Sequence, residues 1–131
     1  MGGRAVQPPG WPRPHGYSNG MAARGEVIAV AGQIGWDERG VLVGPGFAEQ
    51  FERALANVAA VVRAAGAEMS DLVSLTIYVI DRVEYAGAMK QIGAAYRKIM
   101  GEHYPAMALV QVAGLLEPGA KVEIQGLAVR P

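Results

Sequence analysis

The stretch DLVSLTIYVIDRVE, residues 71–84, decides the fold because it leads from a strand directly into a helix. Apolar residues alternate with Ser, Thr and Tyr at the period of two that is typical of a half-buried strand. The residues expected on the dry face are Val73, Leu75, Ile77 and Val79. Asp81 and Glu84 then match a capping box, in which two side chains accept hydrogen bonds from free N–H groups at a helix start. This order predicts helices packed on a sheet.

An amphipathic helix is predicted on each side of this strand. From about residue 46 to residue 65, apolar residues recur every three or four positions and share one helical face. They are Phe47, Phe51, Leu55, Val58 and Val62. Gly66 follows where a C-terminal cap belongs. The downstream helix carries Met89, Ile92, Tyr96 and Met100 at the same spacing, and we expect it to end at Gly101.

Further strands are predicted at both ends of the chain. GEVIAVAGQIG, residues 25–35, has apolar residues on both alternating faces, which is typical of a strand covered on both sides. After Pro105, residues 106–115 and 121–129 form two more strand patterns, separated by a turn. The order of elements predicts an α+β fold. Its mixed sheet has about six strands and carries both helices on one face.

Composition narrows the class of protein. The 131 residues correspond to one domain, and 51% hydrophobic against 18% charged residues predicts self-association. Twelve basic and twelve acidic residues, with no block of like charge, argue against a nucleic-acid partner. The sequence has no cysteine and two histidines, so no dedicated metal site is expected.

The N-terminal residues set the expected domain boundary. Residues 1–14 are rich in Pro and Gly, so we predict a flexible tail there and a single domain over residues 15–131. The start lacks the apolar segment of a signal peptide, and no apolar run reaches the length of a membrane span. The expected location is therefore the cytoplasm, without a membrane partner.

Glu123 and Gly32 are the first candidates for function. In the last strand, Val122 and Ile124 face the core, so Glu123 lies on the other face. It is either solvated or, if a second subunit covers that face, desolvated and able to exchange a proton near neutral pH. Gly32 inside a strand marks either a close approach of a ligand or backbone, or ordinary packing. Phosphate-binding loops and hydrolase triads are not evident.

Four segments carry a resemblance to a known family. They are GYSNGM (16–21), VAGQIGWDERGVLV (30–43), FAEQFERALANVAAVVRAAGAEMSDLVSLTIYVID (47–81) and YPAMALVQVAGLLEPGAKVEIQGLAV (104–129). In this order they resemble the RidA/YjgF family of reactive-intermediate deaminases, also called the endoribonuclease L-PSP family. The resemblance covers nearly the whole chain after Pro14. It is most specific at AGQIG, in the spacing from Gln50 to Asn57, and at KVEIQGLAV.

The resemblance implies a chorismate-mutase-like α+β fold and a homotrimer with a small-molecule cleft between neighbouring subunits. Active members hydrolyse imines and enamines, such as 2-aminoacrylate, to a keto acid and ammonia without a metal or cofactor. Tyr17 and Glu123 match the family's tyrosine and glutamate, which makes them the expected catalytic residues. The ribonuclease activity in some family names fits poorly, because the chain has no basic track.

Three positions depart from the family's pattern. Met107 stands in Pro105-Ala106-Met107 where active deaminases carry an arginine that binds the substrate carboxylate. Ala31 replaces a small hydroxyl residue, and Leu109 replaces Cys or Ser. We therefore expect a cleft for a more apolar ligand than 2-aminoacrylate, with Ala31, Gly32, Met107 and Leu109 as ligand-binding residues. The alternative is a non-catalytic trimer that binds a metabolite or a protein and keeps a decayed site.

The strand after Pro105 leaves one geometric choice. By the two-residue period, Met107 and Leu109 share one face, and Val110 shares the other face with Val112. The valines are the better core residues, so Met107 is expected to turn away from the helices, toward the cleft with Tyr17 and Glu123. If another cation replaces the missing arginine, Arg24 and Arg130 are the first candidates.

Overall fold

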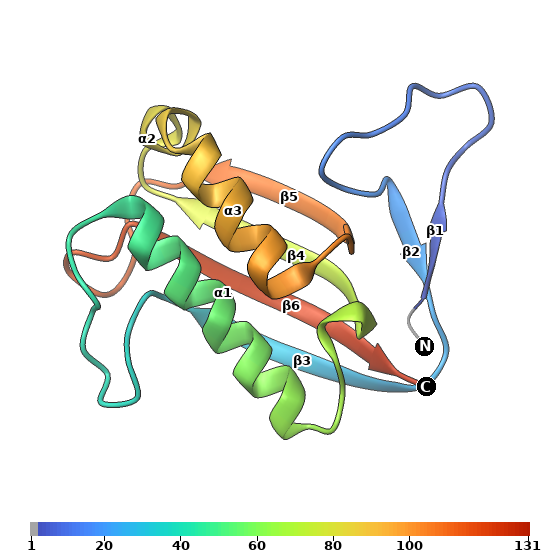
Figure 1. The fold of residues 1–131 in the computed structure, drawn as a ribbon, viewed down its shortest axis with the longest axis horizontal. Helices are drawn as coiled ribbons and strands as arrows, with labels where there is room; N and C mark the ends of the chain where they lie inside the picture. The colour runs from blue at the N-terminus through green and yellow to red at the C-terminus, as the bar shows by residue number, and fades with distance from the viewer. Residues whose placement is uncertain (1–2) are drawn as a thin grey trace.

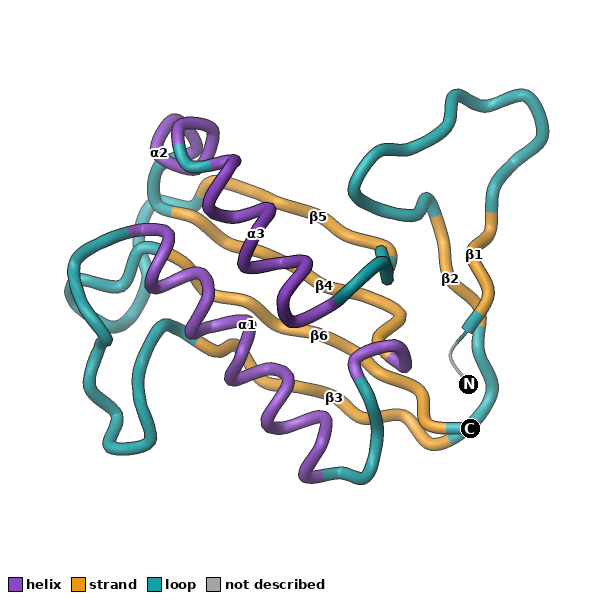
Figure 2. The backbone as a smooth tube through the Cα atoms, in the orientation of Figure 1, coloured by secondary structure: helices purple, strands orange, loops and turns teal. Residues whose placement is uncertain are grey.

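The structure, a computed structural model, describes residues 3–131 as one layer of helices on one layer of strands (Figures 1 and 2). The strands are β1 (Arg4–Val6), β2 (Gly20–Ala22), β3 (Glu26–Gln33), β4 (Leu72–Val79), β5 (Ala106–Gln111) and β6 (Val122–Arg130). The helices are α1 (Phe47–Ala64), α2 (Arg82–Gly87) and α3 (Met89–Met100), with a 3₁₀ turn at Met69–Asp71. The predicted α+β fold is confirmed, and α1 and α3 cover the same face of the sheet (Figure 1).

The strands form two sheets instead of the single sheet expected. The main sheet has the order β3-β6-β4-β5, and it is mixed because β4 and β5 are parallel while the other neighbours are antiparallel. The connection from β4 to β5 contains α2 and α3, as a parallel pair requires. β1 and β2 pair only with each other, and their hairpin stands beside the main sheet in Figure 1.

Part of the predicted tail is therefore a strand. Residues 4–6 form β1, whose register with β2 pairs Arg4 with Ala22. Residues 1 and 2 lie outside the described part of the chain, and the flexibility of residues 1–14 stays a prediction. No helix within residues 3–131 is both long and apolar enough to cross a membrane.

The core lies between α1, α3 and the main sheet. The predicted stripe of α1 is buried from Phe47 to Val62, and Gly66 follows the helix with a φ of 82°, as a C-terminal glycine should. On β4 the expected dry face is confirmed except at its start. Leu72 is fully buried and Val73 is only half-buried, because the register with β6 shifts between Leu72 and Ser74. A bulge of this kind reverses the alternation of faces.

The passage from β4 into α2 has half of the expected capping box. The Asp81 carboxylate accepts hydrogen bonds from the backbone N–H groups of Val83 (2.9 Å) and Glu84 (3.4 Å). The Glu84 carboxylate instead accepts one from Lys121 Nζ at 2.7 Å. The predicted second helix is two helices, α2 and α3, divided after Gly87, a residue type that weakens helices. Helix α3 ends at Gly101, as expected.

The predicted orientation of β5 is wrong. Met107 pairs with Leu75 of β4 and Leu109 pairs with Ile77, so both point toward the helices and pack against the core. Val110 lies on the opposite face and is 43% exposed. Both faces of this strand are apolar in sequence, and the parallel register with the buried residues of β4 decides which one is covered.

The face of the sheet opposite the helices is open in the single chain. Val27 of β3 is 66% exposed and Leu127 of β6 is 41% exposed, on the same face as Val110. The prediction that β3 is covered on both sides therefore fails for one chain alone. Tyr78 and Gln125 also lie there, and the tyrosine hydroxyl donates to the amide oxygen at 2.8 Å. This face is a mixture of apolar and hydrogen-bonding side chains.

Candidate functional site

Glu123 lies where the sequence predicted, half-buried on the open face of β6 between two buried neighbours, Val122 and Ile124. Gly32 of the adjacent strand β3 lies against it, because a Cβ atom at residue 32 would collide with the Glu123 carboxylate. The group close to this glycine is neither a ligand nor a backbone segment, the two that the sequence suggested, but the side-chain carboxylate of the neighbouring strand. A hollow of about 290 Å³ opens here, and it is lined by Gly32, Ile34, Trp36, Leu116, Glu117 and Glu123.

Two amides on α1 hold the loops around this hollow. Gln50 Nε2 donates to the carbonyl oxygens of Gly44 (2.8 Å) and Gly119 (3.1 Å), and its Oε1 accepts from the N–H of Lys121 (2.9 Å). Asn57 Nδ2 donates to the carbonyl oxygens of residues 34 and 36, at 3.1 and 2.9 Å. Gln50 and Asn57 are seven residues apart, which is about two helical turns, so both amides lie on the same face of α1. The spacing from Gln50 to Asn57 thus shapes the Glu123 hollow.

Met107 lies in a different hollow, between β5 and α3. It measures about 230 Å³, and most of its walls are apolar or aromatic. The lining residues are Gly16, Phe51, Ile77, Tyr85, Met89, Ile92, Gly93, Tyr96, Arg97, Tyr104 and Met107. Burial raises the pKa of Tyr85, and it also raises the pKa of Tyr96. Both phenols are therefore neutral hydrogen-bonding groups at ordinary pH. Leu109 does not line this hollow and packs against the core.

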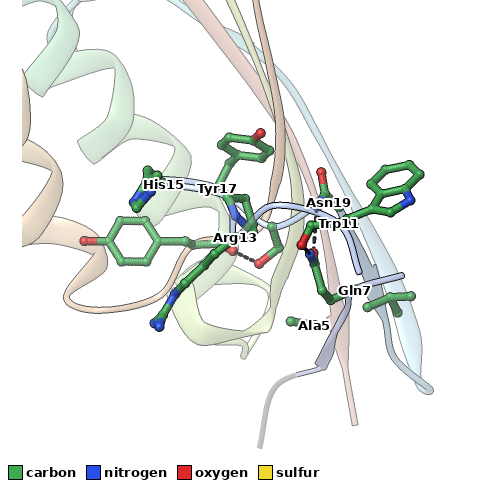
Figure 3. A pocket seen from close by; sticks show the side chains of 12 residues that line it. Ala5, Gln7, Trp11, Arg13, His15, Tyr17 and Asn19 are labelled. Atoms are coloured by element: carbon green, nitrogen blue, oxygen red, sulfur yellow. Dashed lines mark hydrogen bonds between the residues drawn. The ribbon is translucent and has the colours of Figure 1, made fainter. Parts of the chain in front are cut away.

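Tyr17 lies at the edge of the sheet, 42% exposed, in a third hollow of about 630 Å³ (Figure 3). Arg13 and His15 lie at one end of this hollow, and Trp11 lies at the other end. The loop is tied to the start of β5 through Ser18, whose N–H donates to the carbonyl oxygen of Pro105 at 3.1 Å.

The Tyr17 and Met107 hollows adjoin each other. Gly16 and Tyr104 line both of them. The ring of Tyr104 stacks on that of Tyr96, with centroids 5.3 Å apart and planes at 6°. The Ser18 hydroxyl donates to the carbonyl oxygen of Tyr104 at 2.6 Å, which fixes the loop against this stack.

Within one chain, the predicted site residues fall into two groups. Glu123 and Val110 both pair with Tyr78 of β4, so they lie at the same position along the strands. Ser18, next to Tyr17, pairs instead with Ala106 at the start of β5. Ala106 and Val110 are four residues apart on β5, which is about 13 Å along the strand. Met107 also faces the helices, while Glu123 faces away from them. The Glu123 group and the Tyr17–Met107 group therefore do not meet in a single subunit.

The structure adds residues that the sequence did not single out. Trp36 lines the Glu123 hollow, and Arg97 lines the Met107 hollow. Ala31 is exposed, and its carbonyl oxygen accepts from Gln33 Nε2 at 3.1 Å. Within residues 3–131, no three His, Cys, Asp or Glu side chains are grouped so that they could hold a metal ion.

Comparisons with known proteins agree with this architecture. Residues 12–130 match the family described as Endoribonuclease L-PSP. The chain is 34% identical over 109 residues to the 2-iminobutanoate/2-iminopropanoate deaminase of Salmonella typhimurium, covering 81% of each protein. It is 32% identical over 105 residues to the human protein of that name, covering 79% of this chain and 73% of the human one.

Two solved structures extend the likeness to the fold. A Rid-family protein of unknown function from Yersinia pestis, YyfB, has a TM-score of 0.84 and 32% identity, with 99% of this chain and 100% of that chain covered. TdcF of E. coli, solved with bound serine, has a TM-score of 0.69 and 29% identity, with 98% and 99% covered. The chain is a member of the endoribonuclease L-PSP family, the RidA/YjgF family that its sequence resembles.

Proposed function

We propose that this protein hydrolyses an imine or enamine of a small metabolite with an apolar side chain, in a cleft shared by two subunits. The observation that carries the proposal is the division of the candidate residues into two groups on opposite faces of the sheet. A cleft that uses both groups needs Glu123 and Gly32 from one copy and Met107 from a second copy. The deaminase names of the two relatives support the class of reaction.

The reaction needs a positioned water and a group that moves protons. Glu123 accepts a proton from a water while the water oxygen bonds to the C=N carbon, and it then passes this proton to the imine nitrogen. As the C–N bond of the resulting carbinolamine breaks, Glu123 transfers the hydroxyl proton to the leaving nitrogen, which releases a ketone and ammonia and restores the carboxylate. Tyr17 positions the ligand. Gly32 leaves the Glu123 carboxylate the room that a side chain would fill.

The first prediction is weak turnover of 2-aminoacrylate. A thioether at residue 107 has no hydrogen-bond donor for the substrate carboxylate, and a charge-assisted hydrogen bond contributes about 1.5–3 kcal/mol. We therefore expect this protein to be much slower than the Salmonella relative when both are assayed with the enamine generated in situ by a coupled enzyme. Equal rates for the two proteins would contradict this prediction.

The second prediction is a trimer. The open sheet face exposes Val27, Val110 and Leu127, and apolar area of this kind favours association. Sedimentation equilibrium should give about three times the chain mass of 13.8 kDa. Leu127→Glu adds a charge to that face and should yield smaller species, whereas Val83→Glu, an exposed position on α2, should not. A wild-type monomer at micromolar concentration would rule out a shared cleft.

A binding protein without catalysis is the second candidate, and the loss of polar side chains at Ala31, Met107 and Leu109 favours it. Such a protein keeps the trimer and the hollows but releases no ammonia. A metabolite that raises the Tm of the protein yet leaves its imine unhydrolysed would support this function over the deaminase.

A further inference from the structure

We infer that Arg97 is the anion-binding residue of the Met107 hollow, and that it selects a small carboxylate with an apolar chain. The inference rests on the proposed function, since it names the ligand class of the same site. Arg97 is in the last turn of α3 and lines the hollow together with Met107. It is the one cation, and there is no Asp or Glu, among the described residues that line this hollow.

The conformation of Arg97 follows from the residue one turn before it. A Cβ atom on Gly93 would lie 3.2 Å from Arg97 Nη1 and 3.8 Å from Nη2, so the guanidinium group lies over Gly93. Most other residues would place a side chain in that space. Gly93 itself lines the hollow, so the guanidinium lies at its wall. Glycine destabilises a helix, and at residue 93 it leaves room for the Arg97 guanidinium.

The Arg97 guanidinium has no protein partner among residues 3–131. The ion pairs found there use Arg39, Arg53, Lys98 and Lys121, and Arg97 donates none of the side-chain hydrogen bonds. Arg24 and Arg130 are the two cations that the sequence offered in place of the missing arginine. Arg130 instead donates to the carbonyl oxygen of Gly66 at 3.1 Å. Neither it nor Arg24 lines the Tyr17, Met107 or Glu123 hollow.

The surroundings define the ligand. A guanidinium fork binds a carboxylate through two parallel hydrogen bonds, and its other donors remain free for solvent. Met89, Ile92 and Met107 give the lining apolar contact without donors, and its remaining large side chains are mostly aromatic. A hollow of about 230 Å³ has room for a small molecule. The fitting class is a keto acid, or its imine, whose side chain is a larger aliphatic group than the methylene of 2-aminoacrylate, so weak turnover of that enamine is still expected.

The test measures binding, independently of turnover. Isothermal titration of the full chain with 4-methyl-2-oxopentanoate should show Arg97→Met binding about 10- to 100-fold more weakly than wild type, the loss expected for charge-assisted contacts. Arg97→Lys should recover part of the affinity, because it keeps the charge but not the fork. The neutral ketone 4-methyl-2-pentanone should bind wild type and Arg97→Met equally.

Arg63→Met is the matched control, since Arg63 is also an exposed arginine in the last turn of a helix and lines none of the three hollows. It should bind the keto acid as wild type does. An unchanged Kd in Arg97→Met, an equal loss in Arg63→Met, or no keto acid binding by wild type would overturn the inference. Arg97-dependent binding without ammonia release from the imine would leave it standing and refute the deaminase proposal instead.

Discussion

Gln50→Leu is expected to lower the free energy of unfolding by about 3 kcal/mol or more. Gln50 is fully buried, and its amide makes three hydrogen bonds to the backbone of Gly44, Gly119 and Lys121. Leucine fills a similar volume but leaves these groups without partners, at about 1–3 kcal/mol for each group that stays buried. Equilibrium urea denaturation at a fixed protein concentration measures the loss, since association shifts apparent stability.

Gln91→Leu is the control for this change. Gln91 is exposed on α3 and makes no side-chain hydrogen bond among the described residues, so its replacement should alter stability by about 0.5 kcal/mol at most. If the free energy of unfolding falls equally little in both variants, Gln50 is not what holds residues 44 and 119–121 in place. The frame of the Glu123 hollow would then depend on Asn57 alone.

The helices and the main strands could be predicted because their apolar residues repeat with a clear period. The stripe of α1 and the placement of Glu123 opposite Val122 and Ile124 follow from that period alone. The orientation of β5 could not, because Met107, Leu109 and Val110 are all apolar. Which of them is buried depends on the pairing of Met107 with Leu75, a tertiary contact that no local pattern encodes.

The candidate site shows the same limit. The contact between Gly32 and Glu123 arises from the register of β3 with β6, which the sequence does not contain in readable form. In the sequence Arg97 resembles any exposed charged residue on a helix. The feature that could have pointed to it is Gly93, a glycine one turn earlier inside an otherwise helical pattern. Residues 4–6 were expected in a tail because Pro and Gly surround them, yet they pair with β2.

Glu123→Gln is expected to slow imine hydrolysis about 100- to 10,000-fold, the range that positioned acid–base groups contribute. The amide keeps the shape of the carboxylate beside Gly32 but cannot take the proton of the attacking water. Ammonia release, measured while an L-amino acid oxidase generates the imine of leucine, gives the rate. Binding of 4-methyl-2-oxopentanoate should be nearly unchanged, because its carboxylate is assigned to Arg97 and not to Glu123.

Two other carboxylates make this result specific. Glu26→Gln changes an exposed residue at the far end of β3 and should leave the rate within about twofold of wild type, as for surface positions away from a site. Glu117→Gln changes the second carboxylate that lines the Glu123 hollow. If Glu117→Gln abolishes hydrolysis while Glu123→Gln does not, the proton-transfer role belongs to the loop before β6. Gly32 then makes room for a carboxylate that only shapes the hollow.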